Sequence, residues 1–293
     1  MANTFLTSDN LARVAATLAG KDLGLAALIH RSLEADFTAG KGNVVKVRVP
    51  GSVAAQTRSI FDTSTPLVSD EIAEQSINVT LTDHAYSNVV LSEGDLDLTI
   101  ENFSAQVLAP QVAAVVKYVE RAVATAMKAT PETVAIAFAA ATPAKTFTAI
   151  RSALRSNGVS VDAPLYAAVG TDVYGALLDG PIGTFDANGM VRGFTIVEST
   201  RLAPDEILGF VSEAFALVVR APAVPSGAPY GASVNENGFA LRHIRSYDGT
   251  VAADRSLLSA FVGVQAMPLA VDNEDGTVSL VANGGAVRVL TAA

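Results

Sequence analysis

The chain has 293 residues, of which 50% are hydrophobic and 17% are charged, so it is long enough for one large domain or two modest ones with real cores. Its formal net charge is −9, and no window holds a run of Lys and Arg, which argues against a protein that grips duplex nucleic acid by neutralising phosphates. The absence of cysteine excludes a disulfide framework, a thiolate metal site and a thiol nucleophile, and agrees with assembly in a reducing cytoplasm.

An amphipathic arm is expected at the N-terminus. One helix is predicted to start near residue 8, and a second short helix is predicted from Leu25 to Asp36, after a break at Gly20 to Gly24. The apolar positions of the first helix repeat at helical spacing: Leu11, Val14, Ala15 and Leu18. No basic leader precedes an apolar block, and the apolar run "VAIAFAAA" from 134 is too short to span a bilayer, so a soluble protein without a secretory signal is expected.

Two strands with a long segment between them are predicted next. "VVKVRV" at 44–49 is a clear strand, and "INVTLT" at 77–82 alternates apolar and polar residues. If they pair, residues 50–76 form a loop on a two-stranded ribbon, which is marginal alone in water. Because neither the ribbon nor the arm has an evident partner in its own chain, both are expected to lie on another subunit.

A long helix is predicted in "SAQVLAPQVAAVVKYVERAVATAMKA", residues 104–129. Its main part runs from Ala109 to Lys128, roughly 30 Å at about 1.5 Å per residue, with Pro110 tolerated in the first turn. One stripe is apolar and faces a sheet: Leu108, Val112, Val115, Val116, Val119, Val123 and Met127. Lys117, Arg121 and Lys128 lie on the opposite side.

The pattern after Pro131 is typical of an α/β block. "TVAIAFAA" is a strand or a buried helix, "AKTFTAIRSALRSNG" an amphipathic helix, and "LYAAVG" a buried strand before the helix "TDVYGALLDG". "GMVRGFTIVEST" gives a turn and a strand, and "EILGFVSEAFALVVRAP" gives one or two strands before a passage rich in Pro and Gly at 221–231. "GFALRHIRSYDG" and "SLLSAFVGVQAM" are two strands joined by a turn, and from Pro268 a small β-meander of three strands ends the chain.

No catalytic or metal site rises above background. His30, His84 and His243 share no metal-ligand spacing, and no GxSxG elbow supports a Ser-His-Asp triad, although such a triad is not excluded by sequence. The acidic residues Glu93, Asp95 and Asp97 are interpreted as solvated, or as favouring the start of the long helix.

Other possible sites are likewise interpreted as turns and strands. "DNEDG" at 272–276 fits a hairpin turn better than a calcium loop, and "GPIGTFDANGMVRG" lacks the spacing of a phosphate-binding loop. Asn78 begins a formal glycosylation sequon but lies in a predicted strand. The sequence therefore predicts a protein that is not an enzyme and has no cofactor.

The order of these elements resembles the major capsid proteins of tailed bacteriophages. The phrases that carry the resemblance are "GNVVKVRVP", "INVTLTDHAYSNVVLSEGDL", "SAQVLAPQV", "GMVRGFTIVEST" and "RHIRSYDGTVAADRSLLSAFVGV". The similarity covers about residues 5–267. It rests on the order of the elements and on the general residue pattern of these segments rather than on an invariant motif.

The resemblance implies an α+β protein with the Johnson fold of that family. It implies these segments: an N-terminal arm (1–36), an extended loop (37–84), a peripheral domain with a spine helix (85–131), an axial domain (132–235), returning strands of the peripheral domain (236–267) and a C-terminal β-meander (268–293). The function implied is a structural protein that assembles with itself into pentamers and hexamers, which form the icosahedral shell around a double-stranded DNA genome. The implied location is the virion, after assembly in the host cytoplasm.

Further partners follow from the same resemblance: scaffolding and portal proteins and possible decoration proteins, with DNA enclosed without sequence-specific binding. The net negative charge suggests a wall that does not adhere to phosphates. Some members of the family crosslink a Lys to an Asn, and Lys41 and Lys46 lie in the loop region, but no motif identifies an acceptor.

Seven charged residues are expected to contribute contacts between subunits. Those in and beside the loop are Arg48, Arg58, Glu71 and Glu74, and those on the returning strands are Arg242, Arg245 and Asp248. Two alternatives stay open: an encapsulin-like cellular compartment with the same fold, and a soluble α/β enzyme built on residues 132–220.

Overall fold

The computed structural model describes residues 8–21, 23–31, 42–67, 69, 71–96, 102–139, 141–181, 184–228, 230–236, 239–273 and 275–291. The chain divides into two compact units. Unit 1 comprises Met1–Val44, Thr80–Met127 and Phe215–Gln265, and unit 2 comprises Val45–Val79, Lys128–Ala214 and Ala266–Ala293. Among the described helices, none has the length and hydropathy needed to cross a membrane.

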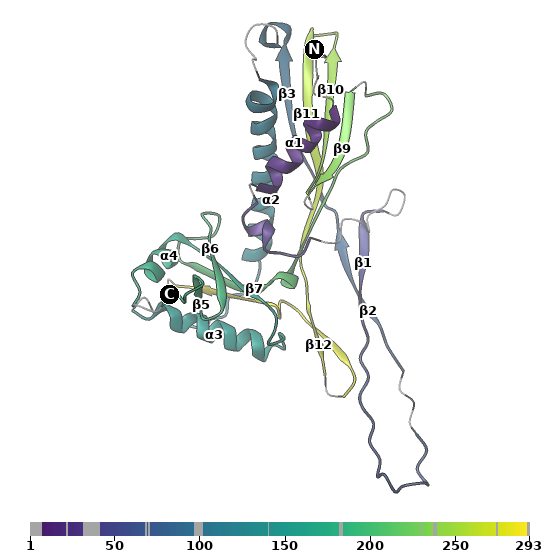
Figure 1. Ribbon diagram of the computed structural model, residues 1–293, viewed down its shortest axis with the longest axis vertical. Helices are drawn as coiled ribbons and strands as arrows, with labels where there is room; N and C mark the ends of the chain where they lie inside the picture. The colour runs from purple at the N-terminus through teal and green to yellow at the C-terminus, as the bar shows by residue number, and fades with distance from the viewer. Residues whose placement is uncertain are drawn as a thin grey trace. The chain divides into compact units, whose positions relative to one another are not determined.

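The centre of unit 1 is a five-stranded sheet (Figure 1). The strand order is β3-β11-β10-β9, and β8 also pairs with β11; their bounds are β3 Asp83–Ser92, β8 Phe215–Arg220, β9 Tyr230–Glu236, β10 Phe239–Asp248 and β11 Ala253–Ala266. The antiparallel pair β10–β11 confirms the two late strands predicted from the sequence. Neither β9 nor the full length of β3 was predicted, because β9 follows a passage that reads as loop.

The long helix α2 (Ala109–Lys128) lies against this sheet and continues from a π-helical turn at Ser104–Leu108. All seven residues of its predicted apolar stripe are buried. The buried Gln111 donates from Nε2 to the carbonyl oxygens of Ser87 (3.1 Å) and Ser256 (2.8 Å), so it joins the helix to β3 and β11. The predicted spine is therefore confirmed in its bounds and in its buried side.

The first helix, α1 (Ser8–Lys21), packs against β9 and β10. Its buried residues are alanines: Ala12, Ala15, Ala16 and Ala19. The predicted stripe was wrong at Val14, which is 38% exposed, because the small alanine side chains let the helix backbone approach the sheet. The side chains of Leu11 and Leu18 lie outside the described residues.

The predicted second helix is only a short 3₁₀ turn, Leu25–Ala27, and residues 32–36 lie outside the described part of the chain. The buried carboxylate of Glu120 on α2 accepts backbone N–H groups from Gly24 (2.7 Å), Leu25 (3.1 Å) and Ala26 (3.1 Å). The expectation that the arm has no partner in its own chain is thus wrong for α1 and for residues 24–26.

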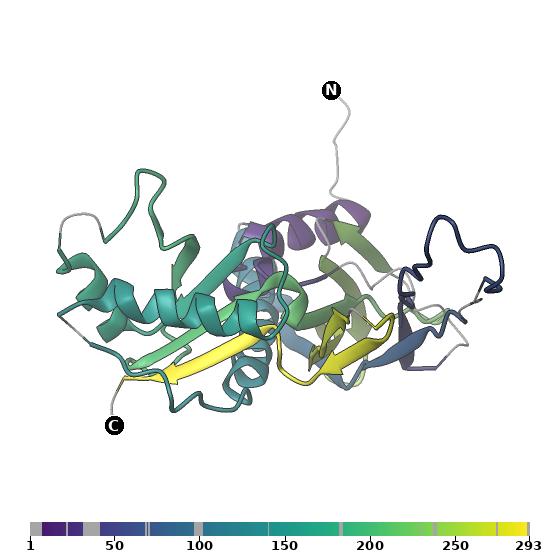
Figure 2. The same cartoon turned by 90° about the horizontal axis from the view of Figure 1, so that it is seen from below.

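Unit 2 contains a second five-stranded sheet of order β14-β7-β4-β6-β5. The bounds of its elements are α3 Pro143–Ser156, β4 Leu165–Val169, α4 Thr171–Leu178, β5 Met190–Val191, β6 Phe194–Glu198, β7 Glu206–Val211 and β14 Ala286–Leu290. Strands β4 and β6 are parallel and the other pairs are antiparallel. Figure 2 shows the yellow strand β14 running beside the other strands of this sheet.

Helix α3 covers this sheet through Phe147, Ile150 and Leu154, all fully buried. The ring of Phe147 meets that of Phe194 edge-on, with 5.9 Å between centroids. A Cβ added at Gly209 on β7 would lie 2.4 Å from Cγ2 of Ile150. The helix therefore needs a glycine on β7 to pack this closely.

Two pairs of strands complete unit 2. β1 (Val44–Val49) and β2 (Gln75–Thr80) form the predicted ribbon, with the first strand as predicted and the second starting two residues earlier. β12 (Leu269–Asp272) and β13 (Val278–Val281) form an antiparallel hairpin. In Figure 1 residues 50–74 extend as a long loop beyond β1 and β2.

Three sequence predictions differ from this fold. The described residues of "TVAIAFAA" form turns instead of a strand or helix, and Val134 is 82% exposed. The third strand of the predicted meander, β14, pairs with β7 rather than with β13. The predicted boundary at 235 also differs, because β8 and β9 pair within the unit 1 sheet.

Candidate subunit interface

The extended loop, defined here as residues 50–74, is closed at its base by a close backbone approach. A Cβ added at Gly51 would lie 2.6 Å from the carbonyl oxygen of Ala73. Arg48 and Glu74 meet across the ribbon at 4.0 Å, with exposed side chains. Such an exposed pair is worth about 0–1 kcal/mol, so the base is held mainly by backbone packing.

The tip of the loop is organised by Asp62. Its Oδ1 accepts the backbone N–H groups of Ser64 (2.8 Å) and Thr65 (3.1 Å), and its Oδ2 accepts the hydroxyl of Thr65 (2.5 Å). Arg58 donates from Nη1 to the carbonyl oxygen of Thr65 at 2.8 Å. The hydrogen bond from the Thr65 hydroxyl, followed by those from Ser64, holds the pKa of Asp62 well below its usual value. The tip is therefore a defined turn rather than a featureless segment.

This turn presents two large apolar side chains to solvent. Ile60 is 89% exposed and Phe61 is 86% exposed. Leu67 and Ile72, on the returning limb of the loop, are also largely exposed. Single exposed apolar residues are ordinary, but adjacent ones on an ordered turn mark an interaction site.

The C-terminal hairpin supports the base of the loop. Gln75 donates from Nε2 to the carbonyl oxygen of Val278 at 2.6 Å. A Cβ added at Gly276, in the hairpin turn, would lie 2.4 Å from the backbone nitrogen of Ala54. On the other side of the hairpin, a Cβ added at Gly158 after α3 would lie 2.7 Å from Val271. The hairpin thus connects the end of α3 to the extended loop.

Part of the unit 1 sheet is uncovered on the face turned away from α2. The loop at 221–228 covers β9 and β10, since Arg242 donates to the carbonyl oxygen of Ala223 (2.8 Å) and Ile244 is buried. On this face His84, Tyr86 and Val90 of β3 and Arg255 and Phe261 of β11 are exposed, whereas Ser259 of β11 is buried. His84 stacks at 5.6 Å from Tyr86 and at 5.1 Å from Phe261, between ring centroids. An aromatic patch therefore remains open to solvent.

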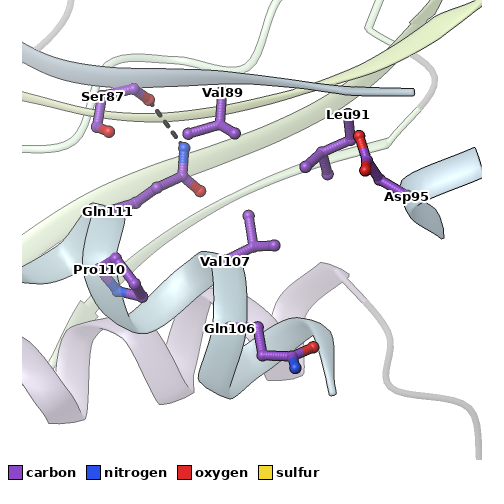
Figure 3. Close-up of a pocket in the computed structure, with 8 residues that line it drawn as sticks. All are labelled: Ser87, Val89, Leu91, Asp95, Gln106, Val107, Pro110 and Gln111. Atoms are coloured by element: carbon purple, nitrogen blue, oxygen red, sulfur yellow. Dashed lines mark hydrogen bonds between the residues drawn. The ribbon is translucent and has the colours of Figure 1, made fainter. Parts of the chain in front are cut away.

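An apolar hollow of about 440 Å³ lies between β3 and the start of α2 (Figure 3). Val89, Leu91, Val107 and Pro110 line most of it. In Figure 3 the side chain of Gln111 points to Ser87 and closes one end of the hollow. The hollow contains no arrangement that suggests catalysis.

Six of the seven charged residues predicted for contacts have partners within their own chain. Arg245 forms a salt bridge with Asp254 and lies over the ring of Phe103, 5.5 Å from its centroid. Asp248 pairs with Arg255 at 2.7 Å. Arg242, Arg48, Glu74 and Arg58 have the contacts given above, and Glu71 is exposed. Their contribution to contacts between subunits stays a prediction.

The described histidines and acidic residues do not form a metal site. Among the described residues, no group of three or more His, Cys, Asp or Glu side chains could hold a metal ion. Glu93 accepts the hydroxyl of Tyr247 at 2.9 Å, Asp95 accepts that of Ser92 at 2.6 Å, and Asp97 lies outside the described residues. The hairpin interpretation of residues 272–276 is confirmed by the pairing of β12 with β13.

His243 belongs to a buried network that the sequence did not reveal. Ser256 donates its hydroxyl to Oε1 of Gln111 at 2.8 Å, so its oxygen accepts the Nε2 proton of His243 at 3.0 Å. Burial, and to a lesser extent Arg245, lowers the pKa of His243 to about 4. These residues lie on three different elements, which explains why linear spacing gave no signal.

No family model matches the chain, and no curated protein matches it, but solved structures do. A structure described as Mycobacterium phage Che8 has a TM-score of 0.56, 15% identity and 90% coverage of both chains. The capsid of an empty GTA particle has a TM-score of 0.54 and 13% identity, over 100% of this chain and 95% of that one. A virus-like particle from Pyrococcus furiosus has a TM-score of 0.52 and 12% identity, over 95% and 97%.

The chain has the Johnson fold of phage capsid proteins. The predicted fold class is confirmed at this level, and the helix at 104–128 is consistent with the spine helix of the Johnson fold. At identities of 11–15%, the similarity establishes the fold, and function is argued separately below.

Proposed function

We propose that this protein is a major capsid protein, a structural protein that assembles with itself into a closed icosahedral shell. The observation that carries the proposal is the extended loop. Ordering the turn at its tip costs backbone conformational entropy. The largest apolar side chains of this turn, Ile60 and Phe61, are covered by nothing in the described chain. Burial of those two side chains against a neighbour would recover about 1.5–3 kcal/mol for each.

The uncovered patch at Phe261 on β11 supports the same proposal. A loop tip and a patch on different surfaces of one chain make a heterologous contact, which closes into rings when the rotation permits. Rings of five and six subunits build an icosahedral shell. The charges at Arg48, Arg58, Glu71 and Glu74, with Arg242, Arg245 and Asp248, would then fix the register more than the stability.

The proposal extends to the contents and the location of the shell. The shell encloses the double-stranded DNA genome of a tailed bacteriophage, so the protein is located in the virion after assembly in the host cytoplasm. Scaffolding and portal proteins are the expected assembly partners, and a decoration protein is a further candidate. Such a shell has no enzymatic role and needs no cofactor.

Negative-stain microscopy with light scattering on the purified chain tests the proposal. Closed shells, or free pentamers and hexamers, are expected. Because many coat proteins need a scaffold, a monomer is tested again after co-expression with the neighbouring genes of its source. A chain that remains a 30 kDa monomer under both conditions, with the loop protected from proteases, would contradict the proposal.

A cellular compartment with enzyme cargo is the second candidate. The similarity to the virus-like particle from Pyrococcus furiosus, which covers nearly all of both chains, favours keeping it. Mass spectrometry and absorbance of particles from the native source separate the two candidates. Nucleic acid inside the particles supports the virion, whereas a stoichiometric enzyme inside them supports the compartment.

A further inference from the structure

The solvent-facing side of α2 carries only positive charge. Its cations are Lys117, Arg121 and Lys128, and its one acidic residue, Glu120, is buried on the other side. At about 1.5 Å per residue, successive cations are about 6 Å and about 10 Å apart along the axis. This cationic side belongs to a chain whose formal net charge is −9.

These cations have no ion-pair partner among the described residues. None of the ion pairs or side-chain hydrogen bonds between described residues includes the side chain of Lys117, Arg121 or Lys128. Like charges at i and i+4, as at Lys117 and Arg121, disfavour an isolated helix slightly. An anionic partner would relieve this repulsion.

A groove lies directly beside two of these cations. It has a volume of about 440 Å³ and is lined on α2 by Lys117, Tyr118 and Arg121, and on β3 by His84 and Tyr86. Tyr86 is 66% exposed and Tyr118 is 37% exposed, so both rings present area to a ligand. The groove thus combines cations with aromatic surfaces.

His84 and Tyr118 add no charge to the groove at pH 7, so its charge is set by Lys117, Arg121 and Asp83. Burial, and then Arg242, lowers the pKa of His84, so its ring is neutral at pH 7 and able to stack. Burial, and then a hydrogen bond with Asp83, raises the pKa of Tyr118, so its phenol stays protonated. Asp83 is the acidic group near this end of the groove, and its negative charge is outweighed by Lys117 and Arg121.

We propose that the groove between β3 and α2 binds the phosphate backbone of nucleic acid. Lys117 and Arg121 contact phosphates, Lys128 extends the cationic track along α2, and Tyr86 and Tyr118 pack against sugars or bases. Cations that follow a backbone, combined with aromatic rings, are the usual means by which proteins bind nucleic acid without reading its sequence. An acidic peptide would use the cations but would have less use for the rings.

The inference goes beyond shell formation and, at this groove, opposes the expectation from net charge that the wall does not adhere to phosphates. The sequence holds no run of Lys and Arg, but the helix gathers three cations on one side. Three phosphate contacts give weak and salt-dependent binding for one chain. Many copies facing one polymer would multiply that affinity through effective concentration.

Fluorescence anisotropy on the full chain tests the inference, with labelled 20-nucleotide single strands and 20-base-pair duplexes at low salt. The test variant is Lys117→Gln/Arg121→Gln. The control is Lys46→Gln/Lys145→Gln, which removes the same charge from exposed lysines elsewhere. The test variant should bind at least tenfold more weakly than the control, and its plot of log K against log salt should be less steep by about 1.4 for single strands or about 1.8 for duplexes.

Tyr86→Ser tests the aromatic part and distinguishes the two nucleic acids. If bases stack on this ring, the variant weakens single-strand binding several-fold and duplex binding less. Equal affinities for the test variant and its control would overturn the inference. Binding of a peptide with the sequence of residues 66–75, "PLVSDEIAEQ", in place of oligonucleotides would also overturn it, since the groove would then receive the loop of another copy.

Microscopy of the same variants separates this inference from the proposed function. If wild type and Lys117→Gln/Arg121→Gln form shells equally well, assembly does not depend on the groove. A chain that binds oligonucleotides but forms no shells would contradict the proposed function, and the inference that the groove binds nucleic acid would still hold.

Discussion

Glu120 is a buried acidic residue whose partners, in the described chain, are backbone N–H groups rather than a cation. Three donors around one carboxylate compensate part of the cost of burying its charge. The donor residues, Gly24 to Ala26, precede Glu120 by 94 to 96 positions in the sequence. The side chain therefore fixes the path of the segment that follows α1.

Glu120→Ala should destabilise the fold by about 3 kcal/mol, because it leaves three buried or half-buried N–H groups without an acceptor. Urea unfolding measures the loss. Hydrogen–deuterium exchange should show faster exchange at residues 24–26. Glu213→Ala, at an exposed site, serves as the control and should change neither measurement. Unchanged protection of residues 24–26 in Glu120→Ala would contradict the assignment.

The buried His243 should make the fold sensitive to acid. Its pKa falls from 6.5 to about 4 in the folded chain, so the unfolded chain binds a proton at a higher pH than the folded one. The contribution is fully present above about pH 6.5 and is lost as pH falls towards 4, amounting to about 3 kcal/mol at about 1.4 kcal/mol per pKa unit. Arg245 faces the ring from β10, and its partner Asp254 on β11 softens that repulsion.

The measurement is the urea midpoint of wild type and His243→Gln between pH 7 and pH 4.5. Glutamine can still donate to Ser256, but it does not titrate. The variant should be less stable at pH 7, and its stability should fall less over this range. Parallel pH profiles would rule out His243 as the cause, since the carboxylates common to both proteins would then account for the loss.

At the scale of elements, the hairpin β12–β13 has a role that its sequence does not announce. It contacts the base of the extended loop through Gln75 and Gly276, and the end of α3 through Val271. A two-stranded hairpin is marginal alone, so these contacts stabilise both partners. The hairpin holds the loop to the rest of unit 2.

Gly276→Ala should loosen the extended loop. Gly276 has φ +81°, and an added Cβ would lie 2.4 Å from the Ala54 nitrogen. Gly189→Ala is a matched control, because Gly189 has φ +73° with no atom within 4 Å of the added Cβ. Both variants carry backbone strain of about 1 kcal/mol or more, but only Gly276→Ala should speed proteolysis within residues 50–74. Equal cleavage rates would show that the hairpin does not support the loop.

At the scale of the whole molecule, several exposed apolar residues have no cover within the described chain. Within the described chain, α1, α2 and the loop at 221–228 cover most of the unit 1 sheet. The tip at Ile60 and Phe61 and the aromatic patch at His84, Tyr86 and Phe261 stay open. Contacts between copies are the proposed cover for the tip and for Phe261, whereas His84 and Tyr86 also line the groove beside α2.

Ile60→Ser/Phe61→Ser should therefore reduce particle yield at least tenfold without changing the stability of the isolated chain, since surface substitutions usually fall within about 0.5 kcal/mol. The control is Val134→Ser/Val161→Ser, which removes two exposed apolar side chains elsewhere. Light scattering and particle counts by microscopy measure assembly. Normal yield from the loop-tip variant would remove the tip from the interface.

Arg58→Glu tests a charge at the same interface. It also removes the hydrogen bond to Thr65, so Arg58→Gln is measured beside it. If Arg58 contacts an acidic group of a neighbouring subunit, Arg58→Glu should lower the yield of assembly more than Arg58→Gln does. High salt should reduce this difference in yield. Equal assembly of wild type and both variants would end the case for Arg58 as a contact between subunits.

Local periodicity determined much of the fold. The strand Val44–Val49, the spine Ala109–Lys128 and the helix at 143–156 follow from spacings of 2 and 3.6 residues, which neighbouring residues alone encode. The exposed charges of the loop and the absence of a catalytic motif were also evident. Segments without periodicity were missed, as at β9, and the alanine-rich run near 134 was misassigned because alanine suits many environments.

Only the tertiary structure decided which surfaces remain uncovered. The sequence could not pair β14 with β7, give Glu120 its backbone partners or bring His243 to Ser256 and Gln111, because each depends on residues far apart in the chain. The gathering of cations beside Tyr86 likewise needs α2 placed along β3. Periodicity fixes which side of an element is apolar, whereas exposure depends on every other element that packs against it.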